Sequence, residues 1–566
     1  MKDAVQPRDS DSEEGVEPQL NCELVASIEL VLFMLLAVVA SGYLVRLLPF
    51  ALPPALMQIA LGAVIAEFSD HAVPLEPDLF FLLFLPPLLF LDGWRIPNDV
   101  LYRDRRLILS LAFGLVVFTV LGAGFLIHSV IPAIPLPVAF ALAAIVSPTD
   151  PVAVGSILSR AAIPRRLLHI LQGESLLNDA SGLVCFRFAV GATLTGVFSP
   201  ASAALTFLWM ASVGVVIGVT FVAAIALLQR WMSRRFGEAL GSPILLSLLM
   251  PFGAYLTAEE AHASGILAAV SAGIAMSHVE LSGRALAITR MQRAAVWNAV
   301  HFTLNGSMFV LLGEQIPAIL AGAVTTVRES GRARAGWLGV YAVVLMLGLW
   351  ALRFVWVWVS LRLTLAWSRK HGVAVRRPPL RIVAATTVAG VRGAVTLAGV
   401  MTLPLSAAGA PFPARDLTIF LAASVILLSL AGASLLLPWL LKGVELPHER
   451  EDHRKEDKAK REAARAAITA VEAARSSIQD TIADADITAH AAARVIELYQ
   501  HRIDDVAHWG DPQQLRRADD AERAFRIAAL QAERDYIFGL ARSGTISDAS
   551  ARRLVREIDL SEARYQ

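Results

Sequence analysis

Residues 173–182 read Gly-Glu-Ser-Leu-Leu-Asn-Asp-Ala-Ser-Gly, within a strongly apolar region of a 566-residue chain. This stretch puts two carboxylates, Glu174 and Asp179, together with a carboxamide and two hydroxyls, inside an otherwise typical transmembrane helix. An ionisable side chain at bilayer depth costs about 2.5–3.5 kcal/mol on insertion scales, so acids found there indicate functional sites. Upstream, the sequence Ser-Pro-Thr-Asp-Pro at residues 147–151 adds Asp150 to the neighbouring apolar stretch. Three acids in two adjacent spans indicate a cation or proton pathway.

The composition is that of a membrane protein. Hydrophobic residues make up 56% of the chain and the net charge is only +1, so no nucleic-acid partner is expected. Cys22 and Cys185 are the two cysteines, which excludes a disulfide framework. The sequence contains neither a nucleophile–base set nor a cofactor motif, so an enzyme is not expected. The polar, acidic residues 1–22 are interpreted as a disordered N-terminal tail.

Apolar stretches separated by charged or turn-rich breaks predict about thirteen transmembrane helices. They cover residues 24–45, 52–67, 77–94, 107–131, 135–158, 168–195, 201–229, 240–258, 262–278, 294–320, 336–361, 382–405 and 416–441. Loops after odd-numbered spans hold 20 lysines and arginines, whereas loops after even-numbered spans hold four. The positive-inside rule therefore predicts a cytoplasmic C-terminus and an outside N-terminus.

The composition changes abruptly after Leu441. Residues 445–566 are charged, rich in alanine and dominated by helix-forming residues, which predicts a helical cytoplasmic region. This region contains no Gly-x-Gly-x-x-Gly turn, so a dinucleotide-binding regulatory domain is not expected. A regulatory module, a dimer-stabilising module and a solvated tail all remain open for it.

Two of the predicted spans are interrupted. Pro148 and Pro151 break the fifth span, and two glycines around Arg392 break the twelfth. If spans 1–6 and 8–13 are two copies of one unit, both breaks fall on the fifth helix of a copy. Six helices plus one linker also invert the second copy. Paired interruptions in an inverted repeat indicate a transporter binding site.

Helical spacing sorts the polar residues of the sixth span. Ser175 and Asp179 are four residues apart and share one face, while Glu174 and Asn178 share the adjacent face. Hard monovalent cations prefer oxygen ligands, and a helix break frees carbonyl oxygens. The expected oxygen ligands are those of Asp179, Asp150, Ser175 and the Thr149 carbonyl. Arg353 and Arg392 also lie within apolar spans, where a buried arginine requires a partner.

Residues 147–154, 173–182 and 390–398 closely resemble the motifs of the sodium/proton exchanger family, the cation:proton antiporters. Bacterial members with a long hydrophilic C-terminus are the most similar, and the resemblance covers about residues 24–442. It implies an all-α fold of thirteen spans with inverted repeats and two discontinuous helices. It also implies a mobile core (about 107–195 and 336–441), dimerisation helices (about 24–94 and 240–320) and elevator-type alternating access.

The family's functional residues carry over onto eight positions. Asp179 matches the aspartate that binds cation and proton alternately, and Asp150, Ser175 and Thr149 match supporting ligands. Glu174 matches a glutamate that pairs with an arginine on a later helix, for which Arg353 is the candidate. Arg392 matches the arginine of the second broken helix. Asn178 is similar to the residue of the electroneutral branch.

Residues at the ends of spans receive less specific interpretations. Asp92 is expected to be solvated or to line a funnel, because it lies near the end of the third span. Asn305, in the tenth span, is expected to form hydrogen bonds between helices. His301 is expected to be a core histidine rather than a pH sensor.

Taken with the charged residues, the resemblance to this family implies a bacterial inner-membrane transporter that exchanges sodium, or lithium, for protons and serves pH homeostasis as a homodimer without a cofactor. A proton or a cation on Asp179 neutralises the site, whereas the empty charged site cannot cross the low-dielectric barrier. A potassium/proton antiporter of the same fold is the alternative. A channel, or a membrane sensor that signals through the C-terminal tail, is a third interpretation from a different class.

Overall fold

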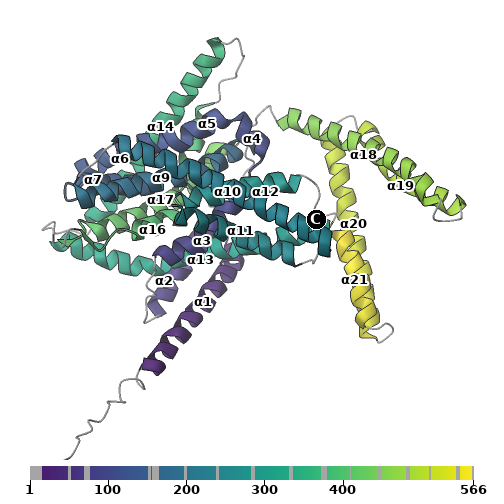
Figure 1. Ribbon diagram of the computed structural model, residues 1–566, viewed down its shortest axis with the longest axis horizontal. Helices are drawn as coiled ribbons and strands as arrows, with labels where there is room; N and C mark the ends of the chain where they lie inside the picture. Colours follow the sequence, from purple (N-terminus) through teal and green to yellow (C-terminus); the bar gives the residue numbers. More distant parts are fainter. Residues whose placement is uncertain are drawn as a thin grey trace, which may run out of the picture. The chain divides into compact units, whose positions relative to one another are not determined.

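The computed structural model divides the chain into two compact units, Met1–Val444 and Glu445–Gln566, here named the membrane unit and the C-terminal unit (Figure 1). It describes residues 16–48, 52–68, 77–150, 155, 165–196, 200–237, 241–281, 287–329, 336–370, 379–407, 410–442, 449–479, 485–508, 512–543 and 548–563. The tail expected over residues 1–22 lies outside the described residues as far as residue 15, and the first helix begins at Val16.

The described part of the membrane unit consists mainly of helices and includes one short hairpin. Its helices are α1 (Val16–Leu47), α2 (Pro54–Phe68), α3 (Pro77–Arg95), α4 (Asn98–Arg103), α5 (Arg105–Leu109), the π-helical turn η1 (Ser110–Gly114), α6 (Leu115–Val130), α7 (Leu136–Val146), α9 (Arg165–Thr195), α10 (Pro200–Phe236), α11 (Ser242–Glu260), α12 (Gly265–Leu281), α13 (Ala287–Glu329), α14 (Gly336–Lys370), α15 (Leu380–Val388), α16 (Ala394–Met401) and α17 (Arg415–Leu441). The hairpin pairs β1 (Ser406–Ala407) antiparallel with β2 (Ala410–Pro411).

Within the described residues, each predicted span corresponds to one helix or to consecutive helical segments, and most of the second half of the span predicted at 135–158 lies outside the described residues. Several helices are longer than the predicted spans, and the stretch predicted at 294–320 belongs to α13, which runs from Ala287 to Glu329. The apolar pattern marks only the part of a helix that suits the bilayer, whereas helix-forming polar residues continue the helix beyond it.

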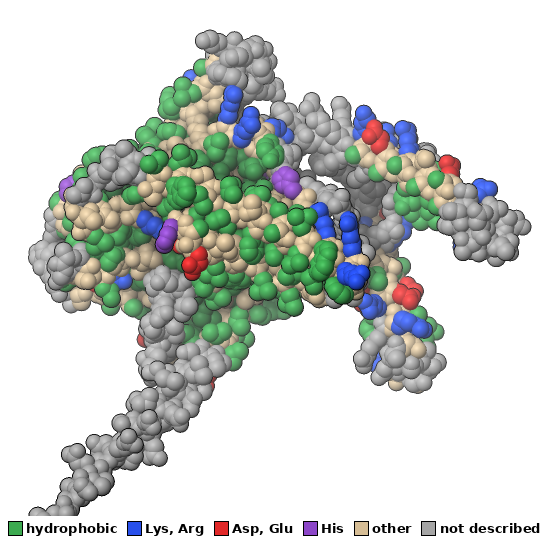
Figure 2. Space-filling view, viewed as in Figure 1, with side chains coloured by type: hydrophobic (Ala, Val, Ile, Leu, Met, Phe, Trp, Pro, Cys, Tyr) green, Lys and Arg blue, Asp and Glu red, His purple; other side chains and the backbone are tan. Residues whose placement is uncertain are grey.

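Six of the described helices are long and apolar enough to cross a membrane, and α2, α7 and most of α12 are shorter apolar helices. Hydrophobic side chains cover much of the visible surface of the membrane unit (Figure 2). On α10, for example, Leu205, Trp209, Val216 and Leu227 are exposed. An apolar surface of this extent suits contact with lipid.

The two predicted breaks are present, and they meet. The first break follows α7 at residues 147–150, and the second separates α15 from α16 at residues 389–393. The Asp150 N–H donates to the Val391 carbonyl at 2.7 Å, so each break satisfies part of the other's backbone. Residue 151, the second proline of the first motif, lies outside the described residues.

Two helix pairs display the inverted repeat. Under the predicted repeat α2 corresponds to α12 and α3 to α13, and the structure packs α2 on α13 and α3 on α12. In the α2/α13 pair, a Cβ added at Gly62 or Gly313 would collide with a backbone carbonyl of the opposite helix. In the α3/α12 pair, a Cβ added at Gly93 or Gly273 would likewise collide with a backbone carbonyl of the opposite helix. Close contact through reciprocal glycines thus occurs twice, at equivalent positions.

The C-terminal unit consists of two helical hairpins. α18 (Glu449–Gln479) packs against α19 (Ala485–His508), and α20 (Pro512–Arg542) packs against α21 (Asp548–Glu562). Arg534 of α20 pairs with Asp559 at 2.9 Å and with Glu562, which ties the second hairpin together. The helical character of this region agrees with the sequence pattern.

Candidate functional site

A small cavity that contains several polar side chains lies where the two helix breaks meet α3, α9 and α13. The volume of the cavity, measured as the space that the centre of a water molecule can occupy, is about 50 Å³. One water needs about 10–15 Å³ on this measure, so the cavity has room for a few waters or one partly hydrated ion. The oxygen- and nitrogen-bearing side chains that line it are those of Asp92, Thr149, Asp150, Ser175, Asp179, Asn305 and Thr396.

The four residues expected to bind the cation all line this cavity. Asp179 and Ser175 reach it from α9, as their shared helical face predicts, and Thr149 and Asp150 reach it from the first break. Asp179 is 8% exposed, and Ser175 and Thr149 are also buried. Two carboxylates, a hydroxyl and the end of a broken helix therefore converge on one small space, which is a donor set suited to a hard cation or a proton.

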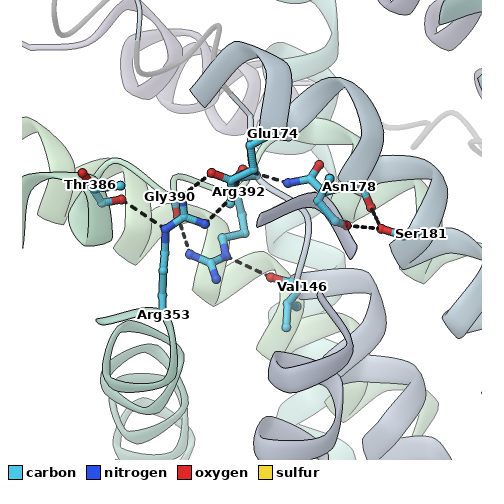
Figure 3. Close-up of polar contacts among 10 residues, drawn as sticks. Val146, Glu174, Asn178, Ser181, Arg353, Thr386, Gly390 and Arg392 are labelled. Carbon is cyan, nitrogen blue, oxygen red and sulfur yellow. Dashed lines mark hydrogen bonds and ion pairs between the residues drawn. The ribbon is translucent and has the colours of Figure 1, made fainter. Parts of the chain in front are cut away.

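Glu174 lies outside the cavity and forms an ion pair with Arg353 (Figure 3). The guanidinium donates to the two carboxylate oxygens at 2.5 and 2.8 Å, in a bidentate arrangement. The Arg353 Nε also donates to the Thr386 carbonyl at 3.1 Å. Glu174 is 1% and Arg353 2% exposed, so the pair is almost completely desolvated and joins α9 to α14 inside the protein.

Asn178 and the Thr149 hydroxyl extend this network. The Asn178 Nδ2 donates to Thr149 Oγ1 at 3.0 Å, and that hydroxyl faces Glu174 Oε1 at 3.4 Å. The Thr149 side chain therefore connects the first helix break to α9. Asn178 is 1% exposed and does not line the cavity, so its position is a supporting one.

Arg392 caps the ends of the two broken helices. Its Nε donates to the Val146 carbonyl at 2.9 Å, at the end of α7, and its Nη1 donates to the Gly390 carbonyl beyond α15 (Figure 3). Its backbone N–H donates to Ser429 Oγ at 3.0 Å. A cation at helix C-termini satisfies free carbonyls and offsets the negative end of each helix dipole.

The cavity also includes residues that the sequence pattern assigned to other roles. Asp92, which was expected to be solvated or to line a funnel, faces the same space as Asp150 and Asp179. Asn305 of α13 lines it as well. The signal for Asp92 was present in the sequence, because it is a carboxylate within an apolar helix. Its closeness to the other acids depends on packing between distant helices.

Gly393 provides the space that Asp150 occupies. A Cβ added at Gly393 would collide with the Asp150 carboxylate oxygen Oδ2 and lie close to its Cβ and Cγ. Gly393→Ala is therefore expected to displace Asp150 and to reduce cation-driven proton exchange by about a hundredfold, the scale of loss for a reacting group moved by about 1 Å. Initial exchange rates in vesicles measure this loss.

Gly399→Ala is not a suitable control, since that glycine packs against Ile145 within the same core. Gly42→Ala is the matched control, because a Cβ there would meet nothing within 4 Å. Exchange in Gly393→Ala equal to that in Gly42→Ala would show that Asp150 does not depend on this close contact.

Residues 32–443 match the family described as sodium/hydrogen exchanger, transmembrane. The chain is 37% identical over 540 residues to an uncharacterised Na+/H+ exchanger of Escherichia coli (strain K12). The aligned region covers 94% of this chain and 98% of that relative. It is 44% identical over 418 residues to a sodium, potassium, lithium and rubidium/H+ antiporter of Bacillus pumilus (strain SAFR-032), covering 73% of this chain and 61% of that relative.

The fold is similar to that of the sodium proton antiporter MjNhaP1 from Methanocaldococcus jannaschii, with a TM-score of 0.56 and 17% sequence identity. The similarity covers 74% of this chain and 99% of that structure. Residues 32–443, which match the family, contain both helix breaks and every residue that lines the cavity. This chain belongs to the sodium/hydrogen exchanger family, a family of multi-pass membrane antiporters.

Proposed function

We propose that this protein exchanges sodium, or lithium, for protons at the cavity between Asp150 and Asp179. The observation that carries the proposal is the convergence of both carboxylates, the Ser175 hydroxyl and the Thr149 end of a broken helix on one space of a few water volumes. Cation and proton are held by the same oxygens in this scheme, so they compete for one site.

Coupling follows from the charge of that site. With a cation bound, or with a proton on Asp179, the site carries one unit less negative charge than in the empty state. An uncompensated charge is costly to move through a low-dielectric region, so the empty site is held on one side while either loaded form crosses. No second binding site is needed for exchange.

The proposed movement is of the elevator type. The core helices (about 107–195 and 336–441) would carry the site, and the dimerisation helices (about 24–94 and 240–320) would stay fixed. The cavity supports this division, because both groups of helices line it: α9 and the helix breaks belong to the proposed core, and α3 and α13 to the proposed dimerisation helices. The closely packed glycine contacts of α2/α13 and α3/α12 suit a rigid framework.

We propose that the protein is a homodimer in the bacterial inner membrane, with the N-terminus outside and the C-terminal unit in the cytoplasm. The bias of basic residues between alternate loops supports this orientation. We also propose electroneutral exchange, since Asn178 is neutral and points its amide at Thr149 rather than at the cavity.

A potassium/proton antiporter is the second candidate. The name of the Bacillus pumilus relative includes potassium and rubidium beside sodium and lithium, which favours a broad specificity. The polar groups that line the cavity are mainly carboxylate and hydroxyl oxygens, which accept any of these ions. The choice between cations therefore depends on cavity size and hydration rather than on ligand type.

The test is proton release from everted vesicles on addition of sodium, lithium, potassium or rubidium chloride at several pH values. Sodium or lithium is expected to reach half-maximal exchange at a concentration about tenfold below that of potassium, a difference of about 1.4 kcal/mol in binding. Equal half-maximal concentrations for sodium and potassium would favour the second candidate. Flux without a counter-ion gradient would indicate a channel, and a rate that follows an imposed membrane potential would contradict electroneutrality.

A further inference from the structure

The helix behind the cation-binding segment contains a π-helical turn. η1 (Ser110–Gly114) lies between α5 and α6, and the Leu115 N–H that ends it donates to the Ser110 carbonyl, five residues back. π turns occur mostly as single insertions in α-helices, frequently at functional sites. η1 packs against α9, and its residues Leu111 and Ala112 are buried. The widened turn therefore faces the helix that carries Asp179.

One hydroxyl of α9 binds this turn. Ser181 Oγ lies 2.7 Å from the Ala112 carbonyl and 3.0 Å from the Asn178 carbonyl of its own helix. A serine within a helix commonly bonds back to its own third or fourth preceding carbonyl. Here the shorter contact is to the other helix, and the hydroxyl has a single hydrogen to donate. Ser181 is 4% exposed, so water cannot easily replace the bond.

Ser181 lies on the side of α9 that faces away from the cavity. It follows Asp179 by two residues, which is a rotation of about 200° around an α-helix. Gly173, eight residues earlier, is rotated by about 80° from Ser181 and by about 120° from Asp179, and it is in contact with Ile108 of α5. The back of α9 is thus held against α5 and η1, and the opposite side presents Asp179 and Ser175 to the cavity.

We propose that Ser181 is a positioning residue for cation binding: its hydrogen bond to the Ala112 carbonyl of the π turn sets the rotation of α9 that places Asp179 and Ser175 in the cavity. This inference rests on the proposed function of that cavity. Side-chain tips lie about 5–6 Å from a helix axis, so a rotation of about 10° moves them by about 1 Å. Displacements of about that size are enough to impair coordination of an ion.

The test compares three substitutions in vesicles and in purified protein. Ser181→Ala removes the hydroxyl, Ser181→Thr retains it, and Thr193→Ala is the matched control on the same helix. The Thr193 hydroxyl bonds at 2.9 Å only to the Ala189 carbonyl of α9 among the described contacts. The two measurements are the sodium concentration for half-maximal exchange, taken with the maximal rate, and the rise in melting temperature caused by sodium.

Ser181→Ala is expected to raise the half-maximal sodium concentration about three- to tenfold, the factor for one net hydrogen bond, with a maximal rate within about twofold of the wild type. It should also require more sodium for the same rise in melting temperature. Ser181→Thr and Thr193→Ala should remain close to the wild type. If Ser181→Ala does not fold, Ser181→Val is compared with Ser181→Thr instead. Valine and threonine have nearly the same shape, so this comparison changes only the presence of the hydroxyl.

An unchanged half-maximal concentration in folded Ser181→Ala, or an equal rise in Thr193→Ala, would overturn the inference. Loss of maximal rate alone, with no change in the sodium requirement, would also overturn it, because a general structural defect has that effect. A wild-type protein that exchanges no monovalent cation would instead contradict the proposed function. The two failures are therefore distinguishable.

Discussion

Asp179→Asn is expected to abolish cation-driven proton movement and to leave the protein folded. The amide has nearly the shape of the carboxylate, but it cannot take up and release a proton and does not carry the charge that a cation neutralises. Asp179 lies at the cavity and takes no part in the ion pair of Glu174 and Arg353. Among the described residues Asp179 forms no ion pair, so its substitution removes a charge from a buried site without leaving an opposite charge there unpaired.

The measurement is the initial rate of sodium-driven proton release from everted vesicles, which should fall to below about 1% of the wild-type rate, a loss of more than about 2.7 kcal/mol in the barrier. The melting temperature of the purified variant should stay within a few degrees of the wild type, since a change of about 1 kcal/mol moves it by only about 2–4 °C in large domains. Asp179→Glu serves as a control that keeps the charge and changes only its position. Normal exchange by Asp179→Asn would disprove the proposed mechanism.

Glu174→Met and Arg353→Met are each expected to destabilise the protein by about 3–5 kcal/mol, the cost of leaving one charge of a buried pair without its partner. The double substitution should cost much less than the sum, because it leaves no unpaired charge in the interior and keeps a similar volume. The bidentate contact and the exposures of 1% and 2% make this pair a strong case of such coupling.

Thermal and denaturant unfolding of the four purified proteins would complete a double-mutant cycle. A coupling energy of at least about 1 kcal/mol is expected for residues in direct contact. Arg415 and Asp416 supply a matched control pair, because they lie 3.7 Å apart and are both partly exposed, which should make their coupling small. Additive losses for Glu174 and Arg353 would show that their contact contributes no net coupling.

The two acids of residues 173–182 should thus behave in opposite ways on substitution. Loss of Asp179 should remove activity from a stable protein, and loss of Glu174 should remove stability first. Helical spacing placed Asp179 and Glu174 on adjacent faces of one helix, which already separated their roles. The structure supplies the reason, since one face meets the cavity and the other meets Arg353.

The organisation of the membrane unit could be predicted from the sequence because its signals are local. A helix that crosses lipid must form all its backbone hydrogen bonds internally and present apolar side chains over about twenty residues. Each span can therefore be recognised from its own stretch of sequence. Pro148 and the glycines around Arg392 interrupt helices through their own backbone chemistry. The limits of α13 were predicted less well, because polar residues continue that helix beyond the apolar stretch.

The candidate site was predicted in part, through residues that are close in the chain. Ser175 and Asp179 share a helical face, and Asp150 lies in the break that precedes their helix. The contribution of Asp92 was not predicted, and neither was the link from Ser181 to Ala112. No local pattern encodes a contact between helices that lie far apart in the sequence.

The sequence by itself therefore determined the all-helical membrane fold, the two helix breaks, the candidate cation ligands and the family to which the motifs point. Only the tertiary structure decided which polar groups meet: Glu174 with Arg353, Arg392 with the carbonyl ends of two broken helices, and Asp92 with Asp150 and Asp179 around one cavity. The physical reason is that hydrophobic length and backbone breaks act within a few residues. Pairing of buried charges depends on how whole helices pack, and that packing brings together side chains such as Glu174 and Arg353, which lie 179 residues apart in the chain.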